Sequence, residues 1–331
     1  MKVLVTGGTG FVGSHIVRCL LRHNETVVCL ARPASRLDNL QALPISIATG
    51  DLKDSSSLYE AVKGCGMVYH SAADYRLWCP DPEEMLRINV DGTDRLMRAC
   101  FEARVDRVVY TSTVGCLGKY ENGTPADEST PVRLEDMQSP YKRTKFLAQQ
   151  RVLEWAARGL PVVIVNPSTP IGEMDLKPTP TGKMIVDFLR GKMFGFVDTG
   201  MNLIDVRDVA EGHWQAAQRG LPGEKYILGN QNLRLQEIFA LLAKMSGVPA
   251  PTLRVPYWVA LAYARVENCW SGRLLQREPS APLEGVRMSQ NKMWFDSSKA
   301  IRELGLWQNP VENALMRAIQ WFQENGYTRP K

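Results

Sequence analysis

The chain has 331 residues, of which 23% are charged and 44% hydrophobic, and its formal net charge is +5. These values are typical of a globular protein that can bury a full α/β core and a smaller second lobe. Lysine and arginine are scattered along the chain, so the charge excludes nucleic acid as the expected partner and suits an anionic ligand or weak attraction to an acidic membrane surface.

A strand, a glycine-rich turn and a helix follow one another at the start of the chain. The apolar run Lys2–Thr6 predicts a buried strand, and the periodicity of Gly10–Arg22 predicts a helix. The glycines between them fit both G-x-G-x-x-G and G-x-x-G-x-x-G. Glycine lets backbone approach a pyrophosphate, and the helix N-terminus offers it free N–H groups. The alternative is a glycine-rich turn without a ligand. We favour a dinucleotide site, lined by Gly7, Thr9, Gly10, Phe11, Val12 and Gly13.

Strands and helices then alternate through the first half of the chain. Further strands are expected at Thr26–Ala31, Ile45–Ala48, Met67–Tyr69, Arg107–Thr111 and Val162–Val165. Further helices are expected at Ser55–Val62, Pro82–Ala103 and Pro140–Ala157. This order predicts an α/β fold: a doubly wound parallel sheet of the Rossmann type, with helices on both faces. Ligands of such sheets bind beyond the carboxyl ends of the strands.

The pattern changes after Asn166, where prolines become frequent and indicate irregular chain. Two later stretches, Leu203–Arg219 and Lys225–Leu228, again look like α/β elements. We therefore expect a dinucleotide-binding domain from 1–166 plus about 200–228. A substrate-binding lobe is expected from 167–199 plus about 229–331.

Arg32 follows the second predicted strand, where NAD-binding folds usually place an Asp or Glu that holds the ribose 2′-hydroxyl. Ser35 and Arg36 stand close behind it. A guanidinium binds phosphate oxygens in a bidentate fork, so this segment favours NADP over NAD. The alternative is a solvated arginine in a surface loop.

Tyr141 and Lys145 stand four residues apart at the start of a predicted helix, after Ser139 and Pro140, which suit an N-cap and a first turn. The pair therefore shares one helix face. A phenol is a poor acid–base group at neutral pH, and the neighbouring ammonium together with a cationic nicotinamide is expected to favour the phenolate and lower its pKa. Tyr141 would then exchange a proton with a substrate while a nicotinamide exchanges hydride.

The spacing alone is weak, because Tyr59 with Lys63 and Tyr327 with Lys331 repeat it. Tyr59 lies in an early helix and Tyr327 in the terminal tail, so we expect structural roles for both. Tyr141 alone follows the fifth predicted strand, at the edge where a cofactor would lie.

Hydroxyl groups end the fifth predicted strand at Thr111, Ser112 and Thr113. Such groups can hydrogen-bond a substrate oxygen and polarise it, although any strand can carry Ser or Thr. Together with Tyr141 and Lys145 they make a hydroxyl–phenol–ammonium set.

Six motifs occur together along the chain: Thr6–Gly13, Gly50–Leu52, Ser71–Ala73, Asn89–Thr93, Thr111–Thr113 and Tyr141-x-x-x-Lys145. With these motifs the chain resembles the extended short-chain dehydrogenases/reductases. Within that group it is similar to the hopanoid-associated sugar epimerases of bacteria, which are relatives of dihydroflavonol 4-reductases. This closer similarity lies in Ala73–Trp78, Asn166–Gly172, Lys177–Gly182, Phe196–Gly200 and Tyr226–Gly229, and it extends to Trp321-Phe322.

The resemblance implies roles for single residues. Thr113 corresponds to the catalytic hydroxyl, Tyr141 to the acid–base residue, and Lys145 to the lysine that also holds the nicotinamide ribose. Further positions correspond to cofactor contacts: Asp51 and Leu52 on the adenine side, then Ala72, Ala73, Asn89, Thr111, Asn166, Pro167 and Thr169. Relatives are often homodimers, so a homodimer is expected.

The substrate side is less defined. Leu77 and Trp78 are expected to line the pocket, and Asp74, Tyr75 and Arg76 to meet the polar part of a substrate. The apolar, aromatic-rich segment 255–264 is either a core-packing helix or a lid or docking surface for a lipidic substrate. We find no clear basic pair that would clamp a nucleotide diphosphate; the candidates are Arg207, Arg254 and Arg287.

Seven dispersed cysteines without a C-x-x-C pair indicate reduced thiols in a cytosolic protein, and four histidines without ligand spacing give no reason to expect a metal. We expect no signal peptide and no membrane-spanning helix, and hence a cytoplasmic protein, with weak peripheral contact to the inner membrane as a further expectation.

These observations predict an NADP(H)-preferring oxidoreductase that moves hydride between nicotinamide and a secondary alcohol or ketone. By resemblance, the substrate is a small molecule, a sugar or a hopanoid side chain. One alternative is a sugar epimerase or dehydratase that retains its cofactor. The other is a dinucleotide-binding regulator without catalysis, which commonly lacks the acid–base residues that this chain has.

Overall fold

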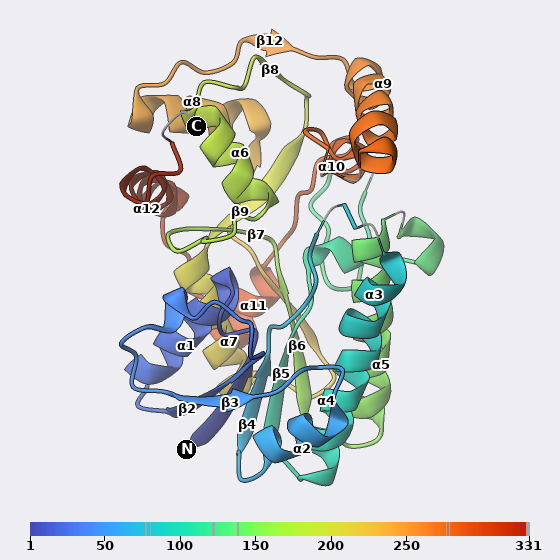
Figure 1. Ribbon diagram of the computed structural model, residues 1–331, viewed down its shortest axis with the longest axis vertical. Helices are drawn as coiled ribbons and strands as arrows, with labels where there is room; N and C mark the ends of the chain where they lie inside the picture. Colours follow the sequence, from blue (N-terminus) through green and yellow to red (C-terminus); the bar gives the residue numbers. More distant parts are fainter. Residues whose placement is uncertain are drawn as a thin grey trace.

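The computed structural model describes residues 1–76, 78–79, 81–120, 123–137, 139–275, 277 and 279–328. A large parallel sheet with helices on both faces occupies one end, and a smaller lobe lies beyond the carboxyl edge of its strands (Figure 1). This is the predicted doubly wound, Rossmann-type architecture with a second lobe.

The main sheet has seven strands in the order β10-β6-β5-β4-β1-β2-β3, and all its neighbours pair in parallel. The chain order reverses between β1 and β4, and such a reversal opens a crevice at the carboxyl ends. The strands are β1 (Lys2–Thr6), β2 (Thr26–Ala31), β3 (Ser46–Thr49), β4 (Met67–His70), β5 (Arg107–Thr111), β6 (Val162–Pro167) and β10 (Lys225–Leu228).

Both faces of the main sheet are buried, so its strands read as continuous apolar runs rather than alternating ones. In β1, Val3 and Val5 enter one core and Leu4 enters the other. The first core is covered by α1 (Phe11–Arg22), α7 (Val206–Arg219) and α11 (Ser298–Leu304). The second is covered by α2 (Ser55–Val62), α4 (Gly92–Glu102) and α5 (Pro140–Ala157).

One predicted helix is broken in the structure. The stretch predicted as a single helix over 82–103 consists of α3 (Pro82–Leu86), a π-helical turn at Arg87–Asp91, and α4. Asp81 caps α3 by accepting a hydrogen bond from the Glu83 N–H at 3.0 Å. Short 3₁₀ turns lie at Asp38–Leu40, Val114–Cys116 and Leu134–Asp136.

The second lobe has its own core, in which Phe188 stacks on Phe239 at a centroid distance of 5.6 Å. Three helices, α6 (Pro180–Leu189), α8 (Leu235–Ser246) and α12 (Val311–Glu324), pack on a sheet of β7 (Thr169–Ile171), β9 (Gly200–Asp205) and β11 (Gln231–Arg234). A two-stranded pair, β8 (Gly195–Phe196) and β12 (Leu253–Arg254), precedes α9 (Tyr257–Glu267), a π-helical turn at Asn268–Leu274 and α10 (Leu283–Met288).

The chain passes repeatedly between the two regions. Strand β9 belongs to the small sheet, while α7, which begins at Val206, packs on the main one. Later in the chain, α11 returns to the main sheet, where Ala300 and Leu304 join its core. The division into 1–166 plus about 200–228 and 167–199 plus about 229–331 stays a prediction.

Two simpler expectations can be compared with the structure directly. All seven cysteines are free. Within the described ranges, no helix is both long enough and apolar enough to cross a membrane.

Candidate active site

A cavity of about 1000 Å³ lies beyond the carboxyl ends of the main sheet and extends into the second lobe. Its walls include residues from almost every segment that the sequence singled out. The predicted residues that line it are Gly7, Thr9, Gly10, Phe11, Val12, Gly13, Arg32, Ser35, Arg36, Asp51, Leu52, Ala72, Ala73, Asp74, Tyr75, Thr111, Thr113, Tyr141, Lys145, Pro167 and Thr169.

The glycine turn after β1 is closed too tightly for side chains. Gly7 has a φ of 75°, and a Cβ on it would lie 2.6 Å from the backbone nitrogen of Ala72. A Cβ on Gly13 would lie 2.1 Å from the Gly7 carbonyl oxygen. Gly10 is the N-cap of α1, so the free N–H groups of that helix face the cavity. This backbone cradle fits a dinucleotide pyrophosphate.

The end of the cavity beyond β2 has one unpaired guanidinium. Arg36 makes two hydrogen bonds with Asp38, at 3.0 and 3.1 Å, whereas Arg32 forms no ion pair within the described residues. The Arg32 N–H donates to Ser35 Oγ at 3.2 Å, which fixes the turn that carries both residues. Arg32 is therefore free to meet an anion that enters the cavity.

Tyr141 and Thr113 meet in the middle of the cavity. Helix α5 begins at Pro140, and Ser139 Oγ accepts a hydrogen bond from the Lys142 N–H at 3.1 Å, so the predicted N-cap is confirmed. A hydrogen bond with Thr113 lowers the pKa of the Tyr141 phenol, but burial is the larger effect and raises that pKa above its usual value. The isolated site thus keeps Tyr141 protonated.

Lys145 is buried at the end of β5. Its Nζ donates to the Thr111 carbonyl oxygen at 2.7 Å and to the Tyr110 hydroxyl at 3.1 Å. Burial lowers the pKa of Lys145 to about 8. Without a nicotinamide the Tyr141 pKa is raised by burial, and Lys145 is directed to the end of β5, so the expected lowering by the ammonium and a cationic nicotinamide together stays a prediction.

Asn166 positions the loop that carries Thr113. It is fully buried, and its Nδ2 donates to the Thr113 carbonyl oxygen at 2.9 Å and to Gln149 Oε1 at 3.1 Å. Ser112 Oγ donates to the same Gln149 oxygen at 2.7 Å. Asn166, predicted as a cofactor contact, does not line the cavity; its side chain holds the Thr113 carbonyl instead.

Asn89 has a similar place behind the wall. Its Oδ1 accepts from the Asp74 N–H at 2.7 Å, and its Nδ2 donates to the Asp74 carbonyl at 2.8 Å and to Thr144 Oγ1 at 3.1 Å. It is therefore buried by the loop after β4 and does not line the cavity. Asp74 itself pairs with Arg76, and both line the cavity.

The structure places Trp78 away from the cavity. Its Nε1 lies 3.1 Å from the position that a Cβ would take on Gly272, so the indole packs against the π-helical turn that follows α9. The expectation that Trp78 lines the pocket is therefore corrected. Leu77, the other predicted lining residue, lies outside the described residues.

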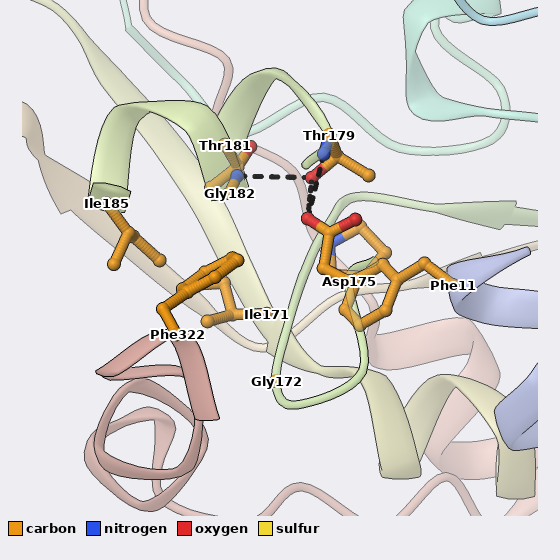
Figure 2. A pocket seen from close by; sticks show the side chains of 10 residues that line it. Phe11, Ile171, Gly172, Asp175, Thr179, Thr181, Gly182, Ile185 and Phe322 are labelled. Carbon is orange, nitrogen blue, oxygen red and sulfur yellow. Dashed lines mark hydrogen bonds between the residues drawn. The ribbon is translucent and has the colours of Figure 1, made fainter. Parts of the chain in front are cut away.

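The loop 173–179 forms a cavity wall that the sequence analysis missed. Asp175, 2% exposed, accepts hydrogen bonds at Oδ2 from the N–H and the hydroxyl of Thr179, both at 2.8 Å (Figure 2). Thr179 Oγ1 in turn accepts from the Gly182 N–H at 3.1 Å and caps α6. Burial raises the pKa of Asp175 to about 6.

This loop is tied to both regions of the molecule. Asn39 Nδ2 donates to the Met174 carbonyl at 3.1 Å, which joins the loop to the dinucleotide side. Tyr327 donates to the Leu176 carbonyl at 2.6 Å, which joins it to the second lobe. The one local signal in the sequence is a carboxylate among prolines, which is too common to identify such a wall.

The wall that the second lobe supplies is rich in methionine. Thioether side chains are flexible and apolar, so they adapt to irregular apolar ligands. The methionines that line the cavity are Met184, Met201, Met288 and Met293.

The segment 255–264 is not a core helix. Within α9 only Ala264 is buried, whereas Trp258 is 72% exposed. Helix α9 packs against α10, whose Met288 lines the cavity (Figure 1). The alternative of a lid or docking surface therefore remains a prediction.

The three arginines considered for a diphosphate clamp are all occupied. Arg207 pairs with Glu173 at 2.8 Å, Arg287 with Glu284 at 3.1 Å, and Arg254 with Asp198. None of the three lines the cavity.

One cluster has metal-ligating atoms within 4.8 Å of one another, from Cys19, His23 and Glu211. Glu211 already accepts from Arg22 at 2.7 Å and forms a 2.9 Å contact with His23 Nε2. These hydrogen bonds account for the cluster without an ion.

The sequence profile of the NAD-dependent epimerase/dehydratase family matches residues 3–229. A dihydroflavonol 4-reductase-like protein from Synechocystis sp. is 47% identical over 98% of this chain and 95% of the relative. Sterol demethylase protein B from Methylococcus capsulatus is 33% identical over 98% of this chain and 99% of its own length.

A solved structure is similar over the whole chain. It is that of a nucleoside-diphosphate-sugar epimerase from Pseudomonas aeruginosa, which matches with a TM-score of 0.84 and 29% identity over 99% of both chains. Similarity of this extent covers the second lobe as well as the dinucleotide side.

Proposed function

Since this chain belongs to the NAD-dependent epimerase/dehydratase family and is an NAD(P)-dependent enzyme, we propose that it is an NADP(H)-preferring reductase or dehydrogenase acting on a ketone or secondary alcohol. The observation that carries this proposal is the meeting of Thr113, Tyr141 and Lys145 in one cavity, at the edge of the sheet where the glycine cradle also opens.

Each residue of the set has its own role in the transfer of hydride and proton. Bound nicotinamide supplies or accepts the hydride. Tyr141 donates its phenolic proton to the substrate oxygen in the reducing direction and takes it back in the other. Thr113 hydrogen-bonds Tyr141 and is placed to polarise the same substrate oxygen. Lys145, held by the Thr111 carbonyl, gives the Tyr141 side of the cavity a positive charge and a hydrogen-bond donor for a ribose.

Arg32 supports the preference for NADP. It stands at the carboxyl end of β2, lines the cavity and has no carboxylate partner among the described residues, whereas Arg36 is paired with Asp38. An unpaired guanidinium suits a 2′-phosphate, and an acid suited to a 2′-hydroxyl does not stand at this position.

The substrate in this proposal is a small molecule with an apolar body, such as a hopanoid side chain, or a sugar. The methionine-rich wall favours a substrate with an apolar body. The Methylococcus relative is named as a sterol demethylase protein, which also points to an apolar substrate. The candidate arginines for a nucleotide diphosphate are all occupied, which argues against a nucleotide sugar.

A second candidate is an epimerase that retains its cofactor, because a named sugar epimerase matches the whole chain at 29% identity. The two candidates differ in the fate of the dinucleotide. An epimerase holds it through the cycle, so protein denatured after purification would release it in stoichiometric amount; a reductase would release little.

The cofactor preference is tested by fluorescence titration with NADPH and NADH. Wild-type protein is expected to bind NADPH more tightly. Arg32→Ala should weaken NADPH binding by roughly tenfold or more and leave NADH binding nearly unchanged. Arg36→Ala is the matched control, and it should change both affinities little because its guanidinium is already paired and exposed. NADH bound as tightly as NADPH by the wild type would contradict the preference.

Three further parts of the proposal concern the surroundings of the enzyme: a cytoplasmic location, a homodimer, and weak peripheral contact with an acidic membrane. The exposed aromatic face of α9 and the turn after it, with Trp258 and Trp270, supports the membrane contact. The fraction of protein that sediments with phosphatidylglycerol vesicles should be lower for Trp258→Ser than for the wild type. It should not fall for Trp307→Ser, which changes a tryptophan of similar exposure elsewhere.

A further inference from the structure

Lys142 is a buried cation in the wall of the cavity, next to the proposed proton donor. It follows Tyr141 on α5, is 8% exposed and lines the cavity. Its Cγ lies 3.7 Å from the position that a Cβ would take on Gly115, so its aliphatic stem packs over the turn that begins at Thr113. Lys142 is thus a buried residue of the cavity wall and not a surface lysine.

A second lysine stands behind the first. Burial, and after it the neighbouring charge of Lys142, lowers the pKa of Lys119 to about 7. Burial also lowers the pKa of Lys142. Like charges on two neighbouring lysines repel each other, and in a partly desolvated place that repulsion is screened little by water.

The described acid that acts on Lys142 is itself paired with an arginine. Neither lysine forms an ion pair with a described residue. Glu284 on α10 is the acid whose charge acts on Lys142, but Arg287 pairs with it at 3.1 Å and occupies it. The Cys116 thiol also faces Lys142, and burial raises its pKa to about 11, so it carries no charge at neutral pH.

We propose that Lys142, backed by Lys119, is a subsite for an anionic group of the substrate, a carboxylate or a phosphate, beside the carbonyl that Tyr141 protonates. This rests on the proposed function. Oxyanions take charge-assisted hydrogen bonds from ammonium groups, and one anion offsets the repulsion between both lysines. The subsite adds a fixed positive charge to a cavity whose lining also includes four methionines, so it selects amphipathic substrates whose anion lies near the reacting carbon.

Matched pairs of probe ketones that differ in charge test this proposal. One pair is 3-oxodecanoate with its methyl ester, and the other is dihydroxyacetone phosphate with dihydroxyacetone. The kcat/KM with NADPH is expected to favour the charged member of at least one pair, and which pair responds identifies carboxylate or phosphate. In Lys142→Met this preference should fall by about tenfold or more.

The matched control is Arg143→Gln, which removes a positive charge one residue later, on the exposed side of α5. It should leave the preference unchanged, and Lys142→Arg should restore much of it. Equal preference for charged and neutral members in the wild type, or an undiminished preference in Lys142→Met, would overturn the subsite.

A measurement without turnover separates this proposal from the function on which it rests. Acetic anhydride labelling, followed by peptide mass spectrometry, reports how accessible the Lys119 and Lys142 amines are. Inorganic phosphate or 3-oxodecanoate should slow labelling of both, relative to exposed Lys244, even if no ketone is reduced. Labelling that saturating amounts of both anions leave unchanged would sink the subsite, whatever the protein catalyses.

Discussion

The two ends of the cavity are built in different ways. The dinucleotide end comes from consecutive strand-to-helix turns, and its shape is set by backbone: Gly7 and Gly13 have no room for a Cβ. The other end is assembled from segments far apart in the chain, such as the Asp175 loop, α6 and α10, and its shape is set by side chains. A cradle made of backbone accepts one kind of ligand. A wall made of methionine side chains and a buried lysine can accept different ligands when those side chains are substituted. This difference explains how one family keeps its cofactor while its substrates change.

Tyr141 lies where the two ends meet, so its removal should have the largest effect. Tyr141→Phe is expected to lower kcat by about a thousandfold, because proton transfer is lost while the ring still packs, and to leave NADPH affinity nearly intact. Stopped-flow absorbance at the nicotinamide band and fluorescence titration measure the two quantities. Tyr59→Phe, which removes the hydroxyl of the same sequence spacing on α2, is the control and should be neutral. Undiminished turnover would reject Tyr141 as the proton donor.

Asp175 tests how firmly the side-chain-built end is held. Its pKa is raised by burial from 3.8 to about 6, so the folded state favours the protonated carboxyl. The stability that this group contributes is full below pH 4 and is lost as the pH rises through 6. Relative to Asp175→Asn, wild-type protein should therefore lose about 3 kcal/mol of unfolding free energy between pH 4 and pH 7. Urea unfolding of both proteins across this range measures it, and parallel curves would contradict the assignment.

Gly13 tests the backbone-built end. A methyl group there would meet the Gly7 carbonyl oxygen at 2.1 Å, so the turn must shift, at a cost of about 1–3 kcal/mol. Gly13→Ala should lower NADPH affinity and thermal stability together. Gly247→Ala is the control: it strains a left-handed residue in open space at the end of α8, so it should lower stability and leave NADPH affinity alone. Unchanged affinity in Gly13→Ala would mean that the cradle does not hold the pyrophosphate.

The same contrast explains what could be predicted from sequence. Elements set by local patterns, such as β1, α2 and α5 with its Ser139 cap, begin and end as predicted. Asn89 and Asn166 were assigned to the cofactor because their roles depend on partners, Asp74 and Thr113, that the fold brings to them.

On the substrate side, too, the positions of several residues could not be predicted because they depend on partners far away in the sequence. Trp78 follows β4 closely, yet Gly272 leaves a space that its indole fills. Lys142 lies inside the tyrosine–lysine motif, but its proposed role in binding an anion depends on Lys119, which comes from another loop. The burial that raises the Tyr141 pKa and the hydrogen bond of Lys145 to the Thr111 carbonyl also depend on the fold, and no spacing reveals them.

Helix α11 has a consequence for how this protein can be divided. Ala300 and Leu304 fill the layer between α7 and β10, although they come seventy residues after that strand. A fragment that stops at 229, where the family profile ends, would lack α11. The apolar side chains of α7 and β10 that α11 covers would then be exposed to water. The core of the main sheet is thus completed by a late segment of the chain, and a fragment ending at 229 would need a substitute for those seven residues.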